Sequence, residues 1–155
     1  MKLILEGNEE KLGKVGWMAE DVKSRIKSKP FLVVRAAGSH GFDLIIIRND
    51  LSIPIEIKSS KEKTLNFSSS SNRSQEQAKE YEGMISKTGV MPLYAYRLKN
   101  VSGDPWRIFT FDFQYEGRYR MFAKNVPKLE VTRGGAYLMK WEKGLKLTSL
   151  LEYLF

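Results

Sequence analysis

The chain has 155 residues, of which 42% are hydrophobic and 12% aromatic, enough for one domain with a substantial core. It has no cysteine and one histidine, which excludes disulfide bonds, thiolate metal sites, cysteine nucleophiles and histidine-rich metal centres. Lys and Arg number 26 against 18 Asp and Glu, and the net charge of +8 favours nucleic acid as a partner, with an anionic membrane surface second.

Targeting and membrane segments are not expected. The longest apolar-rich runs, 42–47 and 90–96, are far shorter than the ~20 residues that cross a bilayer. The N-terminus turns acidic after four apolar positions, unlike a secretory signal. With no linker and no repeat in view, we predict a single intracellular, cytoplasmic domain over 1–155 that does not bind a membrane.

The first half of the chain predicts one helix and three strands. Residues 1–15 contain glycines and an asparagine and are expected to form an N-terminal arm or a short strand. Apolar residues at every fourth position over 17–27 predict a short amphipathic helix, which Pro30 bounds. Three β-branched or alternating runs joined by short turns then predict an antiparallel meander, over 31–35, 43–48 and 52–58.

The second half predicts a longer helix and further strands. An apolar stripe predicts a helix over 75–87, followed by a buried strand over 90–96 that could run parallel to a neighbour. Aromatic residues alternate with polar ones over 106–115, as in a strand whose aromatic side faces the core or, if exposed, a dimer partner. We expect an extra hairpin within 113–140, with strands near 119–123 and 136–141, and a helical turn at the C-terminus. The order of elements indicates an α/β fold with a mixed sheet flanked by helices.

The sharpest chemical feature is Asp43 followed by Glu56 and Lys58. Side chains alternate along a strand, so Glu56 and Lys58 share one face, and Asp43 on the preceding hairpin strand can lie beside Glu56. Two carboxylates and a main-chain carbonyl suit Mg²⁺ or Mn²⁺, and an adjacent lysine can orient water and stabilise charge on phosphorus. These are the parts that phosphodiester hydrolysis needs.

Simpler interpretations of the same residues remain open. Asp43 could be a turn aspartate at a strand start. Glu56 and Lys58 could form an ordinary ion pair on an exposed strand face. Glu20 could be an acidic residue favoured in the first turn of a helix.

The segments around these residues resemble archaeal-type Holliday junction resolvases, a family of the PD-(D/E)-x-K nuclease superfamily. The resemblance is strongest in FLVVRAAGSHGFD (31–43) and IEIKSSK (55–61), with GWMAE (16–20) upstream at the helix start. Weaker similarity continues through MPLYAY (91–96), Trp106-Arg107 and GLKLTSLL (144–151), so it covers most of the chain. Asp21 stands where the family often has an arginine, and 113–140 is longer than in a minimal member.

The resemblance implies a restriction-endonuclease-like fold with a central mixed five-stranded sheet. It implies a catalytic set of Glu20, Asp43, Glu56 and Lys58, with Mg²⁺ (or Mn²⁺) held by the three carboxylates and the Ile57 carbonyl. It also implies a homodimer that cuts two opposed strands of a four-way DNA junction symmetrically. The residues expected to contact DNA are Arg35, Ser39, His40, Ser59, Lys61 and Lys63.

Three other functions are considered beside junction resolution. The first is another nuclease of the superfamily, acting on duplex, flap or single-stranded DNA. The second is a DNA-binding module that keeps the fold without catalysis, against which the carboxylates at 43 and 56 argue. The third, a basic structural or membrane-surface protein, predicts liposome binding and no dependence on metal.

Overall fold

The structure is a computed structural model that describes residues 1–35, 41–49, 51–70 and 72–155. Its main sheet has the strand order β1-β2-β3-β5-β6-β9 and a smaller sheet has the order β4-β8-β7. The strands are β1 (Leu32–Arg35), β2 (Leu44–Arg48), β3 (Leu51–Ser60), β4 (Thr64–Asn66), β5 (Leu93–Leu98), β6 (Trp106–Thr110), β7 (Glu130–Val131), β8 (Tyr137–Lys140) and β9 (Leu145–Lys146). The helices are α1 (Lys2–Leu5), α2 (Glu9–Gly13), α3 (Glu20–Ser28), α4 (Phe67–Ser70), α5 (Asn72–Thr88), α6 (Gly117–Asn125), α7 (Leu147–Leu154) and a 3-10 turn, η1 (Trp141–Lys143).

The ten-residue strand β3 changes its neighbours halfway along its length. Its first half pairs antiparallel with β2, up to the pair Leu44 and Ile55. Its second half pairs parallel with β5, from Ile55 opposite Leu93 to Ser60 opposite Leu98. The helix α5 lies in the connection between β3 and β5, as parallel pairing requires a crossover. Pairing with β2 ends at Ile55, so Glu56 and the residues after it lie beside the chain segment that leads into β2.

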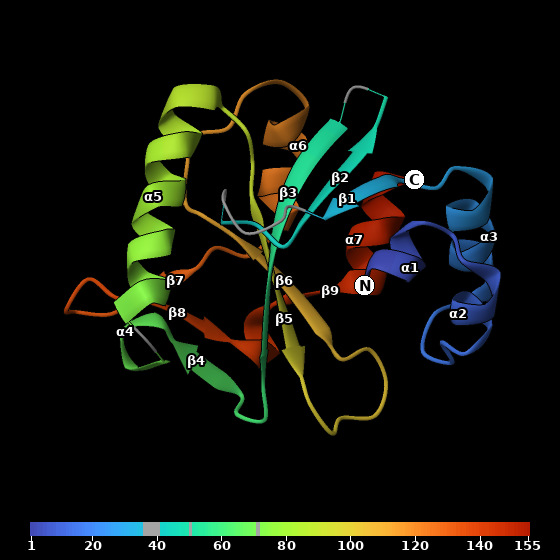
Figure 1. The fold of residues 1–155 in the computed structure, drawn as a ribbon, viewed down its shortest axis with the longest axis horizontal. Helices are drawn as coiled ribbons and strands as arrows, with labels where there is room; N and C mark the ends of the chain where they lie inside the picture. Colours follow the sequence, from blue (N-terminus) through green and yellow to red (C-terminus); the bar gives the residue numbers. More distant parts are fainter. Residues whose placement is uncertain (36–40, 50, 71) are drawn as a thin grey trace.

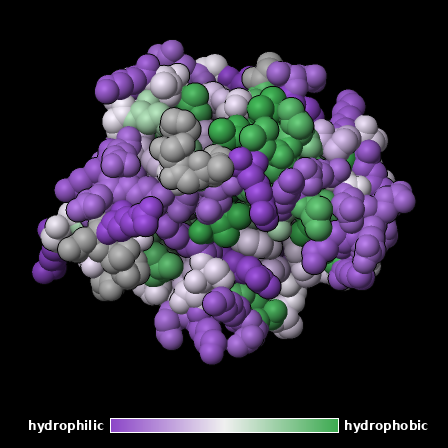
Figure 2. Space-filling model, in the orientation of Figure 1, coloured by the Kyte–Doolittle hydropathy of each residue, from purple (hydrophilic) through white to green (hydrophobic). Residues whose placement is uncertain are grey.

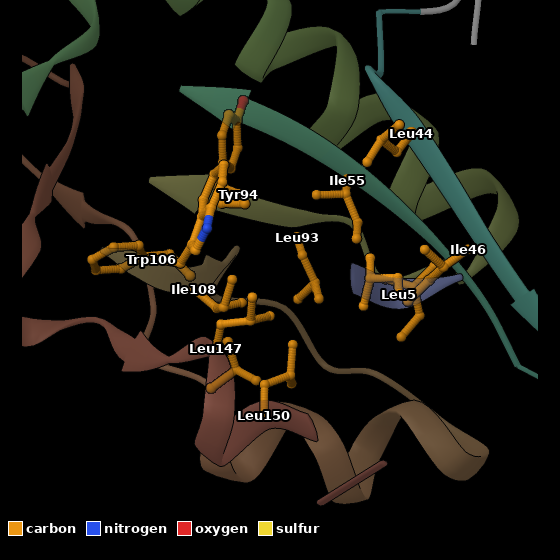
Figure 3. Packing of buried hydrophobic residues seen from close by; sticks show 14 of the residues in the cluster. Leu5, Leu44, Ile46, Ile55, Leu93, Tyr94, Trp106, Ile108, Leu147 and Leu150 are labelled. Carbon is orange, nitrogen blue, oxygen red and sulfur yellow. The ribbon is translucent and has the colours of Figure 1, made fainter. Parts of the chain in front are cut away.

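The two faces of the main sheet are covered by different elements (Figure 1). One face packs against α1 and α7, where Leu5 and Leu147 meet Ile55, Leu93 and their neighbours (Figure 3). On the other face lie α5 and the smaller sheet, with Tyr81 and Tyr94 among a cluster of aromatic rings. Because Glu56 alternates with Ile55, its side chain projects toward the α5 face.

The two helices predicted over 17–27 and 75–87 are present as α3 and α5, whereas the N-terminus differs from the prediction. Residues 2–13 form the short helices α1 and α2, not an arm or a strand. Ile4, Leu5 and Leu12 are buried in the core, and the Asn8 side chain accepts a hydrogen bond from the Lys11 amide at 2.9 Å. A cap and buried apolar residues at helical spacing therefore decide the local structure here.

The strand predicted over 106–115 ends at Thr110. The 127–129 segment takes over there: the Thr110 amide donates to the Pro127 carbonyl and the Thr110 carbonyl accepts from the Leu129 amide. Beyond this point the aromatic residues no longer lie on one face of a strand, because Phe111 is buried and Phe113 is 40% exposed.

The strand predicted near 119–123 is a helix, α6, because Tyr119, Phe122 and Ala123 face the core at helical spacing. The hairpin expected within 113–140 is present later in that segment, as β7 and β8. The five expected strands of the main sheet are all present, and the two-residue strand β9 adds a sixth at its edge. Within the described ranges, no helix combines the length and apolarity that a membrane crossing demands.

Candidate active site

Asp43 is fixed at the point where the β2 ladder ends. Its amide donates to the Ile55 carbonyl at 3.1 Å, which extends the pairing of β2 with β3 by one residue. Its carboxylate atom Oδ2 then accepts the Ile57 amide at 2.7 Å. The Asp43 carboxylate thus lies against the backbone on either side of Glu56, on an exposed part of the surface.

Glu56 is buried, with 6% of its surface exposed, and hydrogen-bond donors reach both of its carboxylate oxygens. Lys58 Nζ lies 2.8 Å from Oε1, and the Tyr81 hydroxyl donates to Oε2 at 3.2 Å. Burial raises the pKa of Glu56, the donors Lys58 and Tyr81 lower it, and the negative charge of Asp43 raises it again; the net direction is upward. The predicted pairing of Asp43, Glu56 and Lys58 around the Ile57 backbone is therefore present in the structure.

Two residues of α5 that the sequence analysis did not select complete this arrangement. Gln77 accepts from Lys58 Nζ at 3.2 Å through Oε1 and donates to the Gly41 carbonyl at 2.6 Å through Nε2. Tyr81 lies four residues further along the same helix face, and its single hydroxyl proton is shared between the Gly41 carbonyl and Glu56 Oε2. Its ring stacks on Phe42 with 4.1 Å between centroids and 17° between planes. Both side chains therefore connect β3, which carries Glu56 and Lys58, to the residues Gly41 and Phe42 that precede Asp43.

Gly41 is required by this packing. Its φ is +80°, in the region that favours glycine, and a Cβ atom there would lie 2.9 Å from Tyr81 Cε1. A sequence signal for the helix residues did exist: Gln77 and Tyr81 are separated by four positions in the predicted helix. In the sequence Tyr81 belongs to the apolar stripe of this helix, and only the fold shows that its hydroxyl reaches Glu56.

A buried tyrosine hydroxyl, that of Tyr94, lies among the aromatic side chains next to Glu56. Tyr94 lies opposite Glu56 in the β3–β5 register and is fully buried. Within the described part of the chain its hydroxyl has no hydrogen-bond partner. Burial, followed by the nearby Glu56 charge, raises the pKa of Tyr94, so this side chain stays a neutral phenol beneath the carboxylate.

Four of the residues expected to contact DNA are exposed in the structure. Arg35 ends β1 opposite Leu44 and is exposed beside the start of β2. Ser59 and Lys61 are exposed at the far end of β3, and exposed Lys63 pairs with Glu142 at 2.6 Å. Ser39 and His40, expected to contact DNA, lie outside the described residues.

Glu20 is not brought to the other two carboxylates. It begins α3, which lies across the molecule from α5 (Figure 1). Its side chain is 86% exposed and pairs with Lys23 of the same helix at 2.7 Å. Across the described ranges, no three Asp, Glu or His side chains are grouped as ligands for one metal ion. In this arrangement Glu20 has the contacts of a first-turn helix residue.

The donor set still suits a hard divalent cation. Mg²⁺ is commonly bound through one or two carboxylates and keeps several water ligands. Asp43 and Glu56 supply two carboxylates, and the main-chain carbonyl of Ile57 lies on the strand between them and Lys58. Their oxygen chemistry, with no sulfur or imidazole among them, favours Mg²⁺ or Mn²⁺ over softer metals.

Comparison with known proteins gives matches among solved structures. No protein-family model and no curated protein matches the chain. Among solved structures, the chain is similar to Hjc of Archaeoglobus fulgidus, a Holliday junction resolvase from an archaeal hyperthermophile, with a TM-score of 0.51 and 19% sequence identity. The match covers 86% of this chain and 91% of that one. At this identity the match concerns the fold alone, and it confirms the predicted α/β architecture with a mixed sheet flanked by helices.

Proposed function

We propose that this protein is a metal-dependent endodeoxyribonuclease that resolves four-way DNA junctions by paired, symmetric nicks. The single observation that carries the proposal is the Asp43, Glu56 and Lys58 constellation around the Ile57 backbone, on a fold shared with a junction resolvase. A net charge of +8 supports binding of a polyanion at the same time.

Asp43 and Glu56, with the Ile57 carbonyl, are the residues that would hold Mg²⁺ or Mn²⁺. When bound, such an ion supplies Lewis acidity at the phosphate and lowers the pKa of a bound water. The protein's own contribution is to hold its charges in place: Gln77 directs the Lys58 ammonium toward this region, and Tyr81 orients the Glu56 carboxylate. Lys58 then places positive charge where the phosphorane oxygens develop.

Positioning of the substrate is assigned to four exposed residues. Arg35 stands beside the start of β2, Ser59 lies near the end of β3, and Lys61 and Lys63 lie in the turn between β3 and β4. A strand of DNA that crosses the end of β3 would meet these side chains in order. Contacts of this kind fix the register of the backbone and carry no sequence information.

A homodimer is part of the proposal. The α5 helix leaves uncovered the part of the sheet formed by β1 and β2, on the face to which Glu56 also points. Leu32 is 65% and Val34 is 41% exposed there, next to partly exposed Ile45 and Ile47. We refer to these four residues as the β1–β2 apolar patch, and Figure 2 shows hydrophobic side chains gathered over this region. A second copy on the patch would give two active sites for a two-fold substrate.

The test is cleavage of a four-way junction beside matched duplex, flap and single-stranded DNA. Each substrate is incubated with Mg²⁺, with EDTA, and with the Glu56→Gln protein. Paired symmetric nicks on the junction alone, dependent on both metal and Glu56, are expected. Metal-dependent cutting of the other substrates instead would assign the same site to a different nuclease. Tight binding without cutting under any divalent metal would identify a non-catalytic DNA-binding module.

A further inference from the structure

A pocket lies apart from the acidic site, in the segment 113–128, to which the proposed nuclease function assigns no role. It is a pocket of about 780 Å³ whose walls come from the loop after β6, from α6 and from the chain that follows α6. Its charged lining residues are three cations and one carboxylate: Arg120, Lys124, Lys128 and Glu116. The pocket therefore favours an anion.

The three cations of the pocket differ in exposure and in hydrogen bonding. Arg120 and Lys124 lie four residues apart on one face of α6 and are exposed, and within the described part of the chain neither has a hydrogen-bond or ion-pair partner. Lys128 is half-buried and donates to the Ala123 carbonyl in the last turn of α6. Burial lowers the pKa of its ammonium, although the charge of Asp112 opposes this. The pocket thus combines two unpaired cations with a third that is partly removed from water.

An aromatic ring completes the lining. Phe113 is 40% exposed at the pocket, whereas the neighbouring aromatic residues Phe111 and Tyr115 are buried. The Phe113 ring lies 5.9 Å from that of Tyr115, which supports it from one side and leaves the rest of its surface open. Unpaired bases stack on rings presented in this way, and a cationic groove beside such a ring is the usual composition of single-strand binding sites.

The walls of the pocket are tied to the sheet. The Tyr115 hydroxyl lies 3.2 Å from Thr110 Oγ1, and the segment 127–129 pairs with Thr110 at the end of β6. From α6, the Tyr119 hydroxyl donates to the Ser52 carbonyl in β3. Ser52 precedes Glu56 by four residues on the same strand, which corresponds to roughly 13 Å. The pocket is therefore held at a fixed position relative to the sheet that carries the acidic site.

We infer that this pocket binds one unpaired nucleotide, with its phosphate on Arg120 and Lys124 and its base on Phe113. A paired base is already stacked within its duplex and has no free face for Phe113, so an unpaired nucleotide is the form that this lining recognises. Two sources share this chemistry: a strand of the DNA substrate, and a free nucleotide. The inference rests on nucleic acid being the substrate in the proposed function, and it adds a contact for unpaired nucleotides beside the cleaved strand.

The test measures binding of a labelled single-stranded oligonucleotide by fluorescence anisotropy, without metal. Phe113→Ala is expected to weaken binding roughly tenfold, and Phe113→Tyr to retain it. The Arg120→Ala, Lys124→Ala double variant is expected to reduce the slope of log affinity against log salt by about 1.4, since each single-strand phosphate contact contributes ~0.7. Lys14→Ala, which removes an exposed charge just past the end of α2, is the matched control. All four changes are at exposed positions, so melting temperatures should agree.

Competition separates the two sources. Adenosine monophosphate that displaces the oligonucleotide, and does so less well from Phe113→Ala, would show that free nucleotides also bind. Failure to compete, with the variant effects intact, would assign the site to a DNA strand. Variants that bind like Lys14→Ala would overturn the inference, as would inorganic phosphate competing as well as the nucleotide. None of these readouts requires cleavage, so failure of the nuclease assignment would be seen separately, in the junction assay.

Discussion

At the scale of single residues, Asp43 and Glu56 are expected to be indispensable for cleavage and dispensable for binding. Asp43→Asn or Glu56→Gln removes a carboxylate from the proposed metal site, and a metal supplies several kcal/mol of transition-state stabilisation. We therefore expect the rate of junction cleavage to fall by at least ~100-fold. Binding should stay equal or tighten, because a carboxylate near phosphate is removed.

The measurement is the single-turnover cleavage rate with Mg²⁺, set beside the dissociation constant for the junction without metal. Glu62→Gln serves as control, because Glu62 is an exposed carboxylate just past the end of β3. If either active-site variant kept more than a few percent of the wild-type rate, the assignment of these carboxylates would be wrong.

Gln77 and Tyr81 should act through the residues that they hold. Tyr81→Phe keeps the stack on Phe42 and removes the hydroxyl that reaches Glu56. Gln77→Ala removes one of the two hydrogen-bond partners of Lys58 and leaves the other, Glu56. Each change removes hydrogen bonds worth ~1 kcal/mol, so a cleavage rate roughly five- to tenfold lower is expected, with little change in junction affinity. Lys79→Ala, on the exposed side of the same helix, is the control.

A structural role alone would lower the melting temperature of the Tyr81→Phe protein without changing its cleavage rate at a temperature where it is folded. The kinetic split between rate and affinity therefore distinguishes positioning from folding. Equal cleavage by Tyr81→Phe and wild-type protein would contradict the positioning role.

At the scale of elements, what the sequence could predict depends on how local the signal is. Strand alternation within 55–58 and the short link to Asp43 are local, so the pairing of Asp43, Glu56 and Lys58 was predictable. The contribution of α5 was not, because the approach of Gln77 and Tyr81 to β3 is set by the crossover into β5. The strand predicted near 119–123 was wrong, because Tyr119 and Ala123 pack against the core from one face of a helix.

The placement of α3 leads to a prediction for Glu20. Because Glu20 is exposed and paired with Lys23 on the far side of the sheet from α5, Glu20→Gln should retain cleavage within about twofold and lose at most ~0.5 kcal/mol of stability. Cleavage rates of Glu20→Gln and Asp21→Asn, its exposed neighbour, are compared directly. A loss as large as that of Glu56→Gln would contradict this prediction and support the catalytic role for Glu20 that the family resemblance implies.

At the scale of the whole molecule, charge and apolar surface have different consequences. The excess of 26 basic over 18 acidic residues attracts a polyanion at long range without specifying its shape. Selection of a four-way junction instead needs two active sites at a fixed separation, and a monomer of this chain supplies one. The proposed function therefore depends on association of two copies through the β1–β2 apolar patch.

Substitution within that patch should separate association from catalysis. Leu32→Lys places a charge on the most exposed residue of the patch, at the edge strand of the main sheet, where it meets water in a monomer and an apolar partner in a dimer. Light scattering at micromolar concentration should give a dimer mass for the wild-type chain and a monomer mass for the variant.

Because the acidic site lies within one chain, the monomer should still nick DNA, while paired cutting of both junction strands is lost. Leu3→Lys, at an exposed leucine of α1, is the matched control and should remain dimeric. A monomeric wild-type chain that still cuts both strands together would contradict the proposed dimer, and a dimeric Leu32→Lys protein would place the interface elsewhere.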